Sequence, residues 1–335
     1  KRCRFVTVLF SQCLQMTSQK TEPLFMRFMI APFVDSQTDQ LLDCWRSALP
    51  FDEIGKQEFQ RRVLLDDNFD NQGLIVAKND NNVVVGFISC FILRKPIDGI
   101  GTMPDRGFIQ AFGVSNNYTN QGCGSLLLES AEKYFADNDR KMIVLAPYTP
   151  NYFVPGVDKE HYQTGLHWLQ KHGFQEYSEA LAADANIATF MIPDALQQKE
   201  KALMQEGITI RHLCDTDICS YMNFQKAYMP GPWVEDSRRN LKEMTFGRFS
   251  PTAIWIAIKD GKIVGFCQHE DEHFGPFGVC DELQGKGIGS LLLAKTLHQM
   301  RIEGCHSAWV LWTGERALNG VYRRLGFKLT RRFAI

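Results

Sequence analysis

An internal repeat constrains this chain more strongly than any other feature of its sequence. The tripeptide Phe-Gly-Val stands at 112–114 and again at 277–279, and residues 122–128 recur at 287–293 with a single change. Both pairs are separated by 165 residues, and two matches at one offset are not expected by chance. A repeat of this length is far too long for a solenoid, whose units have about 20–45 residues. The 335 residues therefore predict two copies of one domain.

The two copies share one order of predicted elements. Each has a strand, an amphipathic helix, a hairpin, a fourth strand ending at Phe-Gly-Val, a glycine-rich turn with a helix behind it, a fifth strand and a last helix. The strand, helix, hairpin and fifth strand fall at 28–33, 39–48, 74–93 and 142–146 in the first copy and at 208–213, 217–228, 253–268 and 308–312 in the second. Asp260-Gly261 between alternating apolar runs is a strong hairpin signal. The pattern predicts an α/β fold with a mixed, mostly antiparallel sheet flanked by helices in each copy.

The division of the chain follows from this pattern. Residues 26–193 form the first predicted domain, 194–207 form a polar, helix-prone linker, and 208–335 form the second domain. Residues 1–25 precede the first predicted strand, and we expect them to be a tail that is disordered or not native.

Composition limits the partners that we expect. The 37 basic and 38 acidic residues leave a net charge of −1, so no field of one sign is present to hold nucleic acid or an anionic membrane. The longest apolar runs are a handful of residues, whereas a membrane helix needs about 20. Ten scattered cysteines without a CxxC pair indicate reduced thiols. We therefore expect a cytoplasmic protein, a monomer or homodimer, that binds a small molecule and neither nucleic acid nor membrane.

The glycine-rich turn of the second copy has the chemistry of an anion site. Residues 284–290, Gln-Gly-Lys-Gly-Ile-Gly-Ser, join a predicted strand to a predicted helix. Glycines let the backbone adopt positive φ and approach a ligand closely. The free N–H groups at the start of the helix then face an anion such as a pyrophosphate. The glycine spacing alone fits a tight structural turn equally well.

Two motifs together carry a resemblance. Val279-x-x-x-x-Gln-Gly-x-Gly-x-Gly after a fourth strand resembles the acetyl-CoA signature of the GNAT superfamily of N-acetyltransferases, and Asn-Gly-Val-Tyr-Arg-Arg-Leu-Gly-Phe at 319–327 resembles its last conserved block. The resemblance covers 208–335 well and 26–193 more loosely. Tandem members include mycothiol synthase and acetyltransferases of glucosamine and glucosaminides. The resemblance implies two tandem GNAT-like domains, each with its sheet splayed between the fourth and fifth strands.

The resemblance also implies roles for residues of the second copy. Tyr322 stands where the family commonly places the acid that protonates the leaving thiolate. His273 is our preferred general base, and Glu272 is the alternative on the opposite strand face; a water relay or a self-deprotonating substrate stays open. The residues expected to bind acetyl-CoA are Phe277, Gly278, Val279, Gln284, Gly285, Lys286, Gly287, Ile288, Gly289, Ser290 and Asn319.

No metal is expected in this site. The letters HExxH do occur at 269–273. A zinc site needs both histidines on one helix face, one turn apart. Here the flanking sequence predicts a strand and a turn, so we interpret the match as coincidental.

The first copy retains only part of the pattern. Val114, Gly122 and Gly124 are kept, which makes them a candidate second CoA site. Leu169 stands at the position of the tyrosine acid and Phe108 at that of the histidine. We therefore expect the first copy to lack an acid and a base. Its insertion at 148–158 either walls the substrate cleft or is an ordered surface loop.

The sequence thus predicts an acetyl-CoA-dependent N-acetyltransferase with one working site, in the second copy. Its substrate is expected to be the primary amine of a small molecule, for example an amino sugar such as glucosamine. Candidate residues lining the substrate pocket are Trp233, Glu235, Trp309 and Trp312. Two alternatives stay open: acylation of a thiol-sugar amine, as in mycothiol synthase, and a non-catalytic acetyl-CoA sensor.

Overall fold

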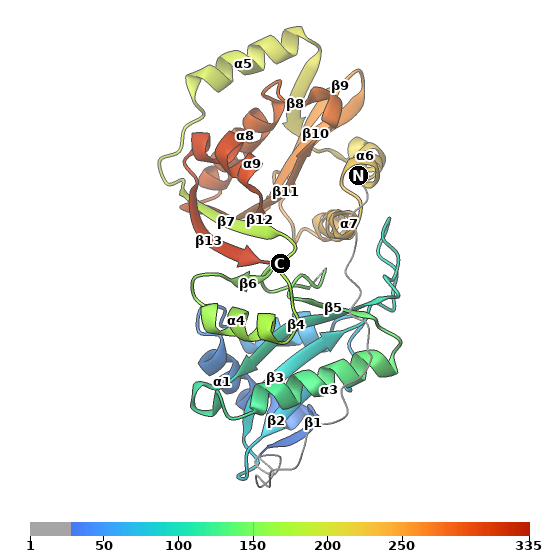
Figure 1. The fold of residues 1–335 in the computed structure, drawn as a ribbon. Helices are drawn as coiled ribbons and strands as arrows, with labels where there is room; N and C mark the ends of the chain where they lie inside the picture. Colours follow the sequence, from blue (N-terminus) through green and yellow to red (C-terminus); the bar gives the residue numbers. More distant parts are fainter. Residues whose placement is uncertain (1–27, 150) are drawn as a thin grey trace.

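The computed structural model describes residues 28–149 and 151–335, and the tail predicted at 1–25 lies outside them. Two α/β units stand one above the other, the N-terminal unit below and the C-terminal unit above (Figure 1). The predicted fold class, an α/β protein with mixed, mostly antiparallel sheets flanked by helices, is confirmed. Within the described stretches, no helix is long and apolar enough to cross a membrane.

The N-terminal unit is built on a five-stranded sheet with helices on both faces. Its strands run in the order β1 (Met29–Pro32), β2 (Leu74–Lys78), β3 (Val84–Phe91), β4 (Arg106–Val114) and β5 (Met142–Leu145). Only the β4–β5 pair is parallel. Helices α1 (Thr38–Ala48) and α2 (Lys56–Phe59) cover one face, and α3 (Cys123–Asp137) covers the other. Every residue of β3 is buried because both faces of the sheet are covered.

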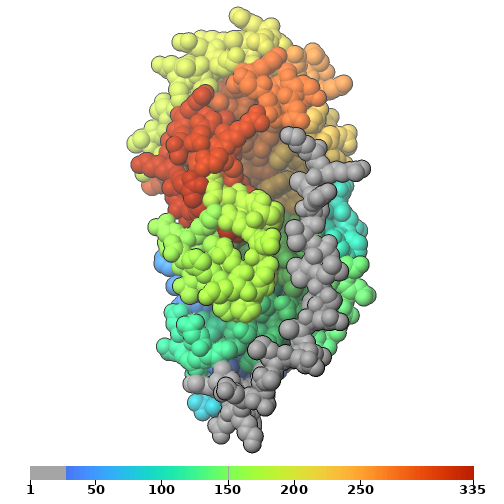
Figure 2. All heavy atoms as spheres, in the orientation of Figure 1, coloured from blue at the N-terminus to red at the C-terminus, as the bar shows by residue number. Residues whose placement is uncertain are grey.

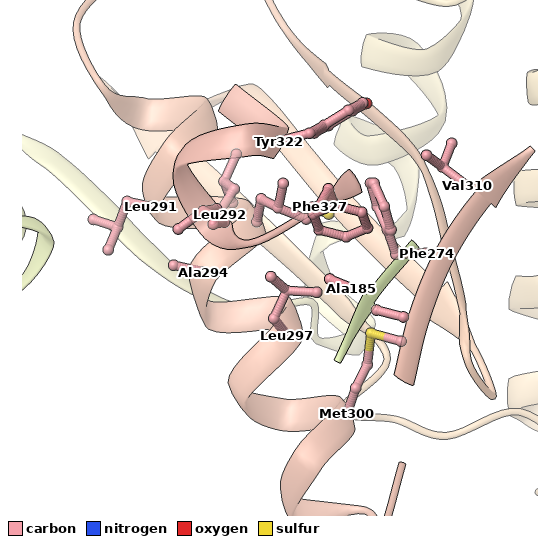
Figure 3. Packing of buried hydrophobic residues seen from close by; sticks show 14 of the residues in the cluster. Ala185, Phe274, Leu291, Leu292, Ala294, Leu297, Met300, Val310, Tyr322 and Phe327 are labelled. Atoms are coloured by element: carbon pink, nitrogen blue, oxygen red, sulfur yellow. The ribbon is translucent and has the colours of Figure 1, made fainter. Parts of the chain in front are cut away.

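The C-terminal unit contains an eight-stranded sheet. Its order is β6 (Val157–Asp158), β13 (Lys328–Ala334), β7 (Glu179–Asn186), β12 (Ser307–Thr313), β11 (His273–Val279), β10 (Lys262–Glu270), β9 (Ile254–Lys259) and β8 (Ile208–His212). Its helices are α5 (Asp194–Gln205), α6 (Ile218–Tyr228), α7 (Pro232–Thr245), α8 (Ile288–Ile302) and α9 (Glu315–Ala317), and α4 (Gln163–Lys171) lies against the N-terminal sheet. The core of this unit forms where α8 packs on the sheet, with Phe274 and Phe327 among its aromatic members (Figure 3).

Strand β7 comes from the N-terminal half of the chain but lies in the middle of the C-terminal sheet. Ala183 is the partner of Val310 in β12 on one side and of Leu329 in β13 on the other. Over residues 180–183 both faces of β7 are buried, one against the core under α8 and the other against Phe333 and its neighbours. The boundary predicted at 193/194 therefore does not separate the two sheets, because the N-terminal half supplies β6 and β7 to the C-terminal one.

A buried ion-pair network also joins the units. Arg331 of β13 places its guanidinium 2.7 and 3.0 Å from the two carboxylate oxygens of Asp52, and its Nε 2.5 Å from Asp158. Burial would raise the pKa of Asp158, but hydrogen bonds from Arg331 and His161 outweigh it and lower the pKa to about 2. In Figure 2 the yellow-green segment that includes α4 and β6 borders the red C-terminal strand. The two units are thus tied by charges as well as by shared strands.

Candidate active site

The two central strands of the C-terminal sheet separate almost as soon as they meet. Parallel pairing between β11 and β12 is confined to His273 and Trp309, whereas β4 and β5 pair at four successive positions in the N-terminal unit. Beyond His273, β11 continues to Val279 with β10 as its strand partner. The rest of β11 therefore has an open edge on the side of β12, which is the splay that we predicted.

The open edge of β11 presents backbone donors. Cys280 donates its N–H to Val264 in β10 at 2.9 Å. Because backbone groups alternate in direction along a strand, Gly278 also faces β10, and the N–H groups of Phe277 and Val279 face the open edge. These are the two residues to which the resemblance assigns contacts with the pantetheine arm and the thioester of acetyl-CoA.

The glycine-rich turn follows directly and leads into α8. Gly285 and Gly287 have φ of 80° and 87°, a region that favours glycine. The side chain of Gln284 is used within the turn, where it donates to the backbone oxygen of Val279 at 3.2 Å. The bond from Leu291 N–H to Gly287 is the first of the helix, so the preceding N–H groups of α8 are left without a partner inside it. The turn has the geometry of an anion site.

Tyr322 lies beside β11, close to its open edge. It belongs to the helical turn η7 (Leu318–Tyr322), and only 6% of the residue is exposed. Its ring packs edge-on against Phe274 at 5.3 Å between centroids, and its hydroxyl points away from the leucines of α8 (Figure 3). Phe277 at the open edge lies 6.4 Å from the same ring. Burial raises the pKa of Tyr322 to about 12, so the phenol keeps its proton at neutral pH.

Family models match both halves of the chain. The model described as "Acetyltransferase (GNAT) family" matches residues 37–153, and the one described as "Acetyltransferase (GNAT) domain" matches residues 250–329. Together the matches span more than half of the chain and contain β4 and β5, β11 and β12, and the glycine-rich turn of each unit. This chain belongs to the GNAT acetyltransferases. The predicted arrangement of two tandem GNAT domains is confirmed.

Similar proteins match this chain over different lengths. Mycothiol acetyltransferase of Streptomyces griseus is 35% identical over 86 residues, which are 24% of this chain and only 28% of that protein. A glucosamine N-acetyltransferase region of a fungal multi-domain GH3 β-N-acetylglucosaminidase aligns with a TM-score of 0.75 and 19% identity, over 91% of this chain and 37% of the fungal one. A GCN5-related N-acetyltransferase from Sphaerobacter thermophilus aligns with a TM-score of 0.68 and 15% identity, over 92% and 94%. A tandem GNAT protein of the clavulanic acid pathway aligns with a TM-score of 0.59 and 13% identity, over 92% and 97%.

The two candidate bases of this GNAT site lie in different environments. His273 stacks at 4.4 Å on Trp309, and burial, with a contribution from the positive charge of Arg62, lowers its pKa to about 4. This low pKa makes His273 a weak proton acceptor at neutral pH. Glu272 accepts a hydrogen bond from Ser307 N–H at 3.3 Å, and the bonds from Ser307 lower the pKa of its carboxyl group. Glu272 thus helps to hold the start of β12 against β11.

The remaining predicted site residues fall into two groups. Trp309 and Trp312 lie on β12, beside the splay, whereas Trp233 and Glu235 lie in the first turn of α7, where Glu235 pairs with Arg238 at 2.6 Å. The other predicted residues of the turn and the helix start lie together, and of these Gln284, Gly285 and Lys286 are exposed. The amide of Asn319 is engaged by Glu315 at 2.7 Å on the exposed side of η7.

The N-terminal GNAT unit supplies side chains close to the C-terminal site. Tyr152, in the inserted loop, meets Trp312 edge-on at 5.4 Å between ring centroids. Arg62 donates to the backbone oxygen of Tyr152 at 2.7 Å, which fixes the loop from its own unit. The loop therefore reaches the C-terminal site, as the cleft-wall interpretation required. No sequence signal indicates Arg62, since it lies more than 200 residues before His273 and outside every repeated motif.

The candidate second CoA site keeps its turn, but an aromatic side chain covers it. Gly122 has the same φ of 87° as its counterpart Gly287. However, the ring of Trp168 in α4 packs on Phe112 at 5.6 Å, and a Cβ placed on Gly124 would lie 3.5 Å from it. The side chain of Trp168 thus covers the start of α3 beside β4 in this unit.

The HExxH letters fall on a hairpin. β10 ends at Glu270 and β11 begins at His273, and these two residues are partners across the ladder. His269 is therefore on one strand and His273 on the other. Among residues 28–149 and 151–335, no three His, Cys, Asp or Glu side chains are grouped in a way that could hold a metal ion.

Proposed function

We propose that this GNAT protein transfers the acetyl group of acetyl-CoA to the primary amine of a small molecule, with its working site in the C-terminal domain. One observation carries the proposal: the open edge of β11 runs from His273 to the glycine turn of α8, with Tyr322 beside it. These groups lie along one edge and offer hydrogen-bond donors to three parts of acetyl-CoA: the pyrophosphate, the extended pantetheine arm and the thioester sulfur.

The chain's own groups divide the work along this line. The unpaired N–H groups of the turn and of the first turn of α8 bind the pyrophosphate. The N–H groups of Phe277 and Val279 bind the extended arm as an added strand would, and one of them donates to the thioester oxygen as it gains negative charge. With its high pKa, Tyr322 keeps its proton and donates a hydrogen bond to the sulfur as the thiolate forms.

The low pKa of His273 determines how the amine can lose its proton. A histidine with a pKa of about 4 is neutral at pH 7 and takes a proton from an ammonium group only weakly. We propose that His273 accepts a hydrogen bond from the attacking amine, and that the proton leaves to water as the bond to the acetyl carbon forms. The hydrogen bonds from Ser307 turn Glu272 toward β12, which disfavours it as the base.

For the acceptor we propose an amino sugar of the glucosamine class. The supporting observations are the aromatic faces of Trp309, Trp312 and Tyr152 near the splay, which suit the apolar face of a sugar ring. The fold shared with a glucosamine N-acetyltransferase region supports the same class. The partial match to mycothiol acetyltransferase supports, as the second candidate, a thiol-sugar amine.

A panel of amines tests this function. CoA release from acetyl-CoA is followed with glucosamine, a glucosaminide, a thiol-bearing amino sugar, a polyamine and a peptide amine. We expect turnover with the amino sugars and none with the last two. Turnover with the peptide alone contradicts the acceptor class. Tight acetyl-CoA binding without turnover on any amine contradicts catalysis and supports the sensor.

A further inference from the structure

The helix that joins the two GNAT domains lies on the cofactor side of α8. Glu200 in α5 pairs with Lys295 in α8 at 2.9 Å, and the same ammonium lies 4.9 Å over the ring of Trp255. Leu203, also in α5, is 1% exposed in the core beneath α8. These contacts hold α5 in place, so its neighbouring side chains have fixed positions relative to the start of α8.

Lys199 extends from this helix across the glycine turn. A Cβ placed on Gly287 would lie 3.1 Å from Cε, 3.3 Å from Cγ and 3.7 Å from Cδ of Lys199. The aliphatic part of Lys199 therefore covers the residue that caps α8, and its ammonium lies one bond further on. Lys199 is half-buried there.

The charges at this position are unbalanced. Within residues 28–149 and 151–335, no carboxylate lies within ion-pair distance of the Lys199 ammonium, while the adjacent Glu200 is paired with Lys295. The start of α8 carries the positive end of the helix dipole, and Lys286 adds a second cation to the turn. A cation held beside a positive helix end is stabilised when an anion binds between them.

We propose that Lys199 binds the pyrophosphate of acetyl-CoA, so that the segment linking the two domains completes the cofactor site of the second. The inference rests on the proposed function, since it needs acetyl-CoA in this groove. A lysine ammonium binds a phosphate as a point charge. The pyrophosphate lies between the Lys199 ammonium, with which it forms an ion pair, and the N–H groups at the start of α8, from which it accepts hydrogen bonds.

The test compares two lysines of one helix. Lys199→Met keeps the aliphatic stem over Gly287 and removes the charge, whereas Lys201→Met makes the same change at an exposed position of α5. Affinity is measured by calorimetry for acetyl-CoA and for 3′-dephospho-acetyl-CoA. We expect Lys199→Met to weaken both ligands about 10-fold and to raise KM without lowering kcat. We expect Lys201→Met to change neither, and Lys199→Arg to restore most of the affinity.

Each of the other possible results contradicts a different part of the proposal. Equal affinity of the Lys199→Met variant and the unaltered protein overturns the inference while leaving the proposed function intact. A loss seen with acetyl-CoA and absent with the dephospho ligand places Lys199 at the 3′-phosphate and overturns the assignment to the pyrophosphate. An unaltered protein that does not bind acetyl-CoA contradicts the proposed function itself. Unfolding midpoints of the variants confirm that the comparison is between folded proteins.

Discussion

Removing β7 tests how far the two GNAT domains depend on each other. The predicted second domain, residues 208–335, contains His273, Tyr322 and the glycine turn but lacks β7. A longer fragment, residues 176–335, restores that strand together with α5, whose Leu203 packs in the same core. We expect the shorter fragment to be unfolded or aggregated in water and the longer one to fold, because without β7 both β12 and β13 lose the strand that lies between them.

The structure gives the size of the effect. β7 has five residue partners in β12 and six in β13. An antiparallel ladder has about one hydrogen bond for each such pair, and each contributes about 0.5–1.5 kcal/mol net. The loss is on the order of 10 kcal/mol, which is comparable with the whole unfolding free energy of an ordinary domain, about 5–15 kcal/mol. Lost burial of the alanines of β7 adds to it.

Urea unfolding followed by tryptophan fluorescence measures this. The fragments share Trp233, Trp255, Trp309 and Trp312, so the signal reports on the same core in both. We expect a cooperative transition for 176–335 and none for 208–335. If the two fragments unfold cooperatively at the same urea concentration, β12 and β13 can close the sheet without β7, and the reasoning is refuted.

The other predictions concern the site. Tyr322→Phe should lower kcat roughly 10- to 1000-fold while calorimetry shows nearly unchanged acetyl-CoA affinity; unchanged turnover would remove this residue from the mechanism. Because the proposed route sends the proton of the amine to water, we expect the acidic limb of the pH–rate profile to lie at the pKa of the amine both in the unaltered protein and in His273→Ala; a limb near pH 4 that disappears in His273→Ala would show that His273 takes the proton instead. The same histidine should make the fold less stable as pH falls from about 6.5 to 4, because the unfolded chain binds a proton there that the folded chain does not; His273→Ala should flatten that slope in urea unfolding. Gly287→Val should weaken acetyl-CoA binding at least ~10-fold, since it places a branched side chain at a φ of 87° and displaces Lys199; in the matched Gly122→Val variant we expect the same affinity and one acetyl-CoA per chain, as in the unaltered protein.

The sequence predicted the parts of the fold that are repeated in it. The 165-residue offset predicted two units, and Asp260-Gly261 predicted a hairpin. The spacing of the glycines predicted a turn in each copy, and the φ of Gly122 agrees with that of Gly287. These features depend on local residues, so a linear pattern records them. The splay came from the resemblance, because parting of strands depends on pairs that lie far apart in the sequence.

The place of β7 in the C-terminal sheet could not be predicted in this way. Its sequence, Glu-Ala-Leu-Ala-Ala-Asp-Ala-Asn, has little intrinsic preference for a strand, because alanine, aspartate and asparagine are depleted in sheets. The strand forms because small side chains fit between two packed faces. The partner strands, and therefore the domain to which β7 belongs, are decided by packing that no short segment encodes.

Within the site, the residues that the sequence missed come from the other domain. Tyr322 and the glycine turn were identified because they stand in family motifs. Arg62 was not, since it acts across the interface between the domains, and Tyr152 was indicated only as part of the inserted loop at 148–158. The lowered pKa of His273 has the same origin: burial, together with the positive charge of Arg62, makes the charged imidazole unfavourable. An electrostatic environment of this kind is a property of the assembled units.

The position of β7 also sets an order of events during synthesis. Ala183 leaves the ribosome 146 residues (329 − 183) before its β13 partner Leu329, which at about 5–20 residues per second is a delay of roughly 7–29 s. The five strands of the N-terminal sheet have all been made by then, but β7 has no sheet to join. A waiting strand of valine and isoleucine would be an aggregation hazard. The alanines of β7, too small to bury much surface alone, suit a segment that must stay unpaired until the second domain has been translated.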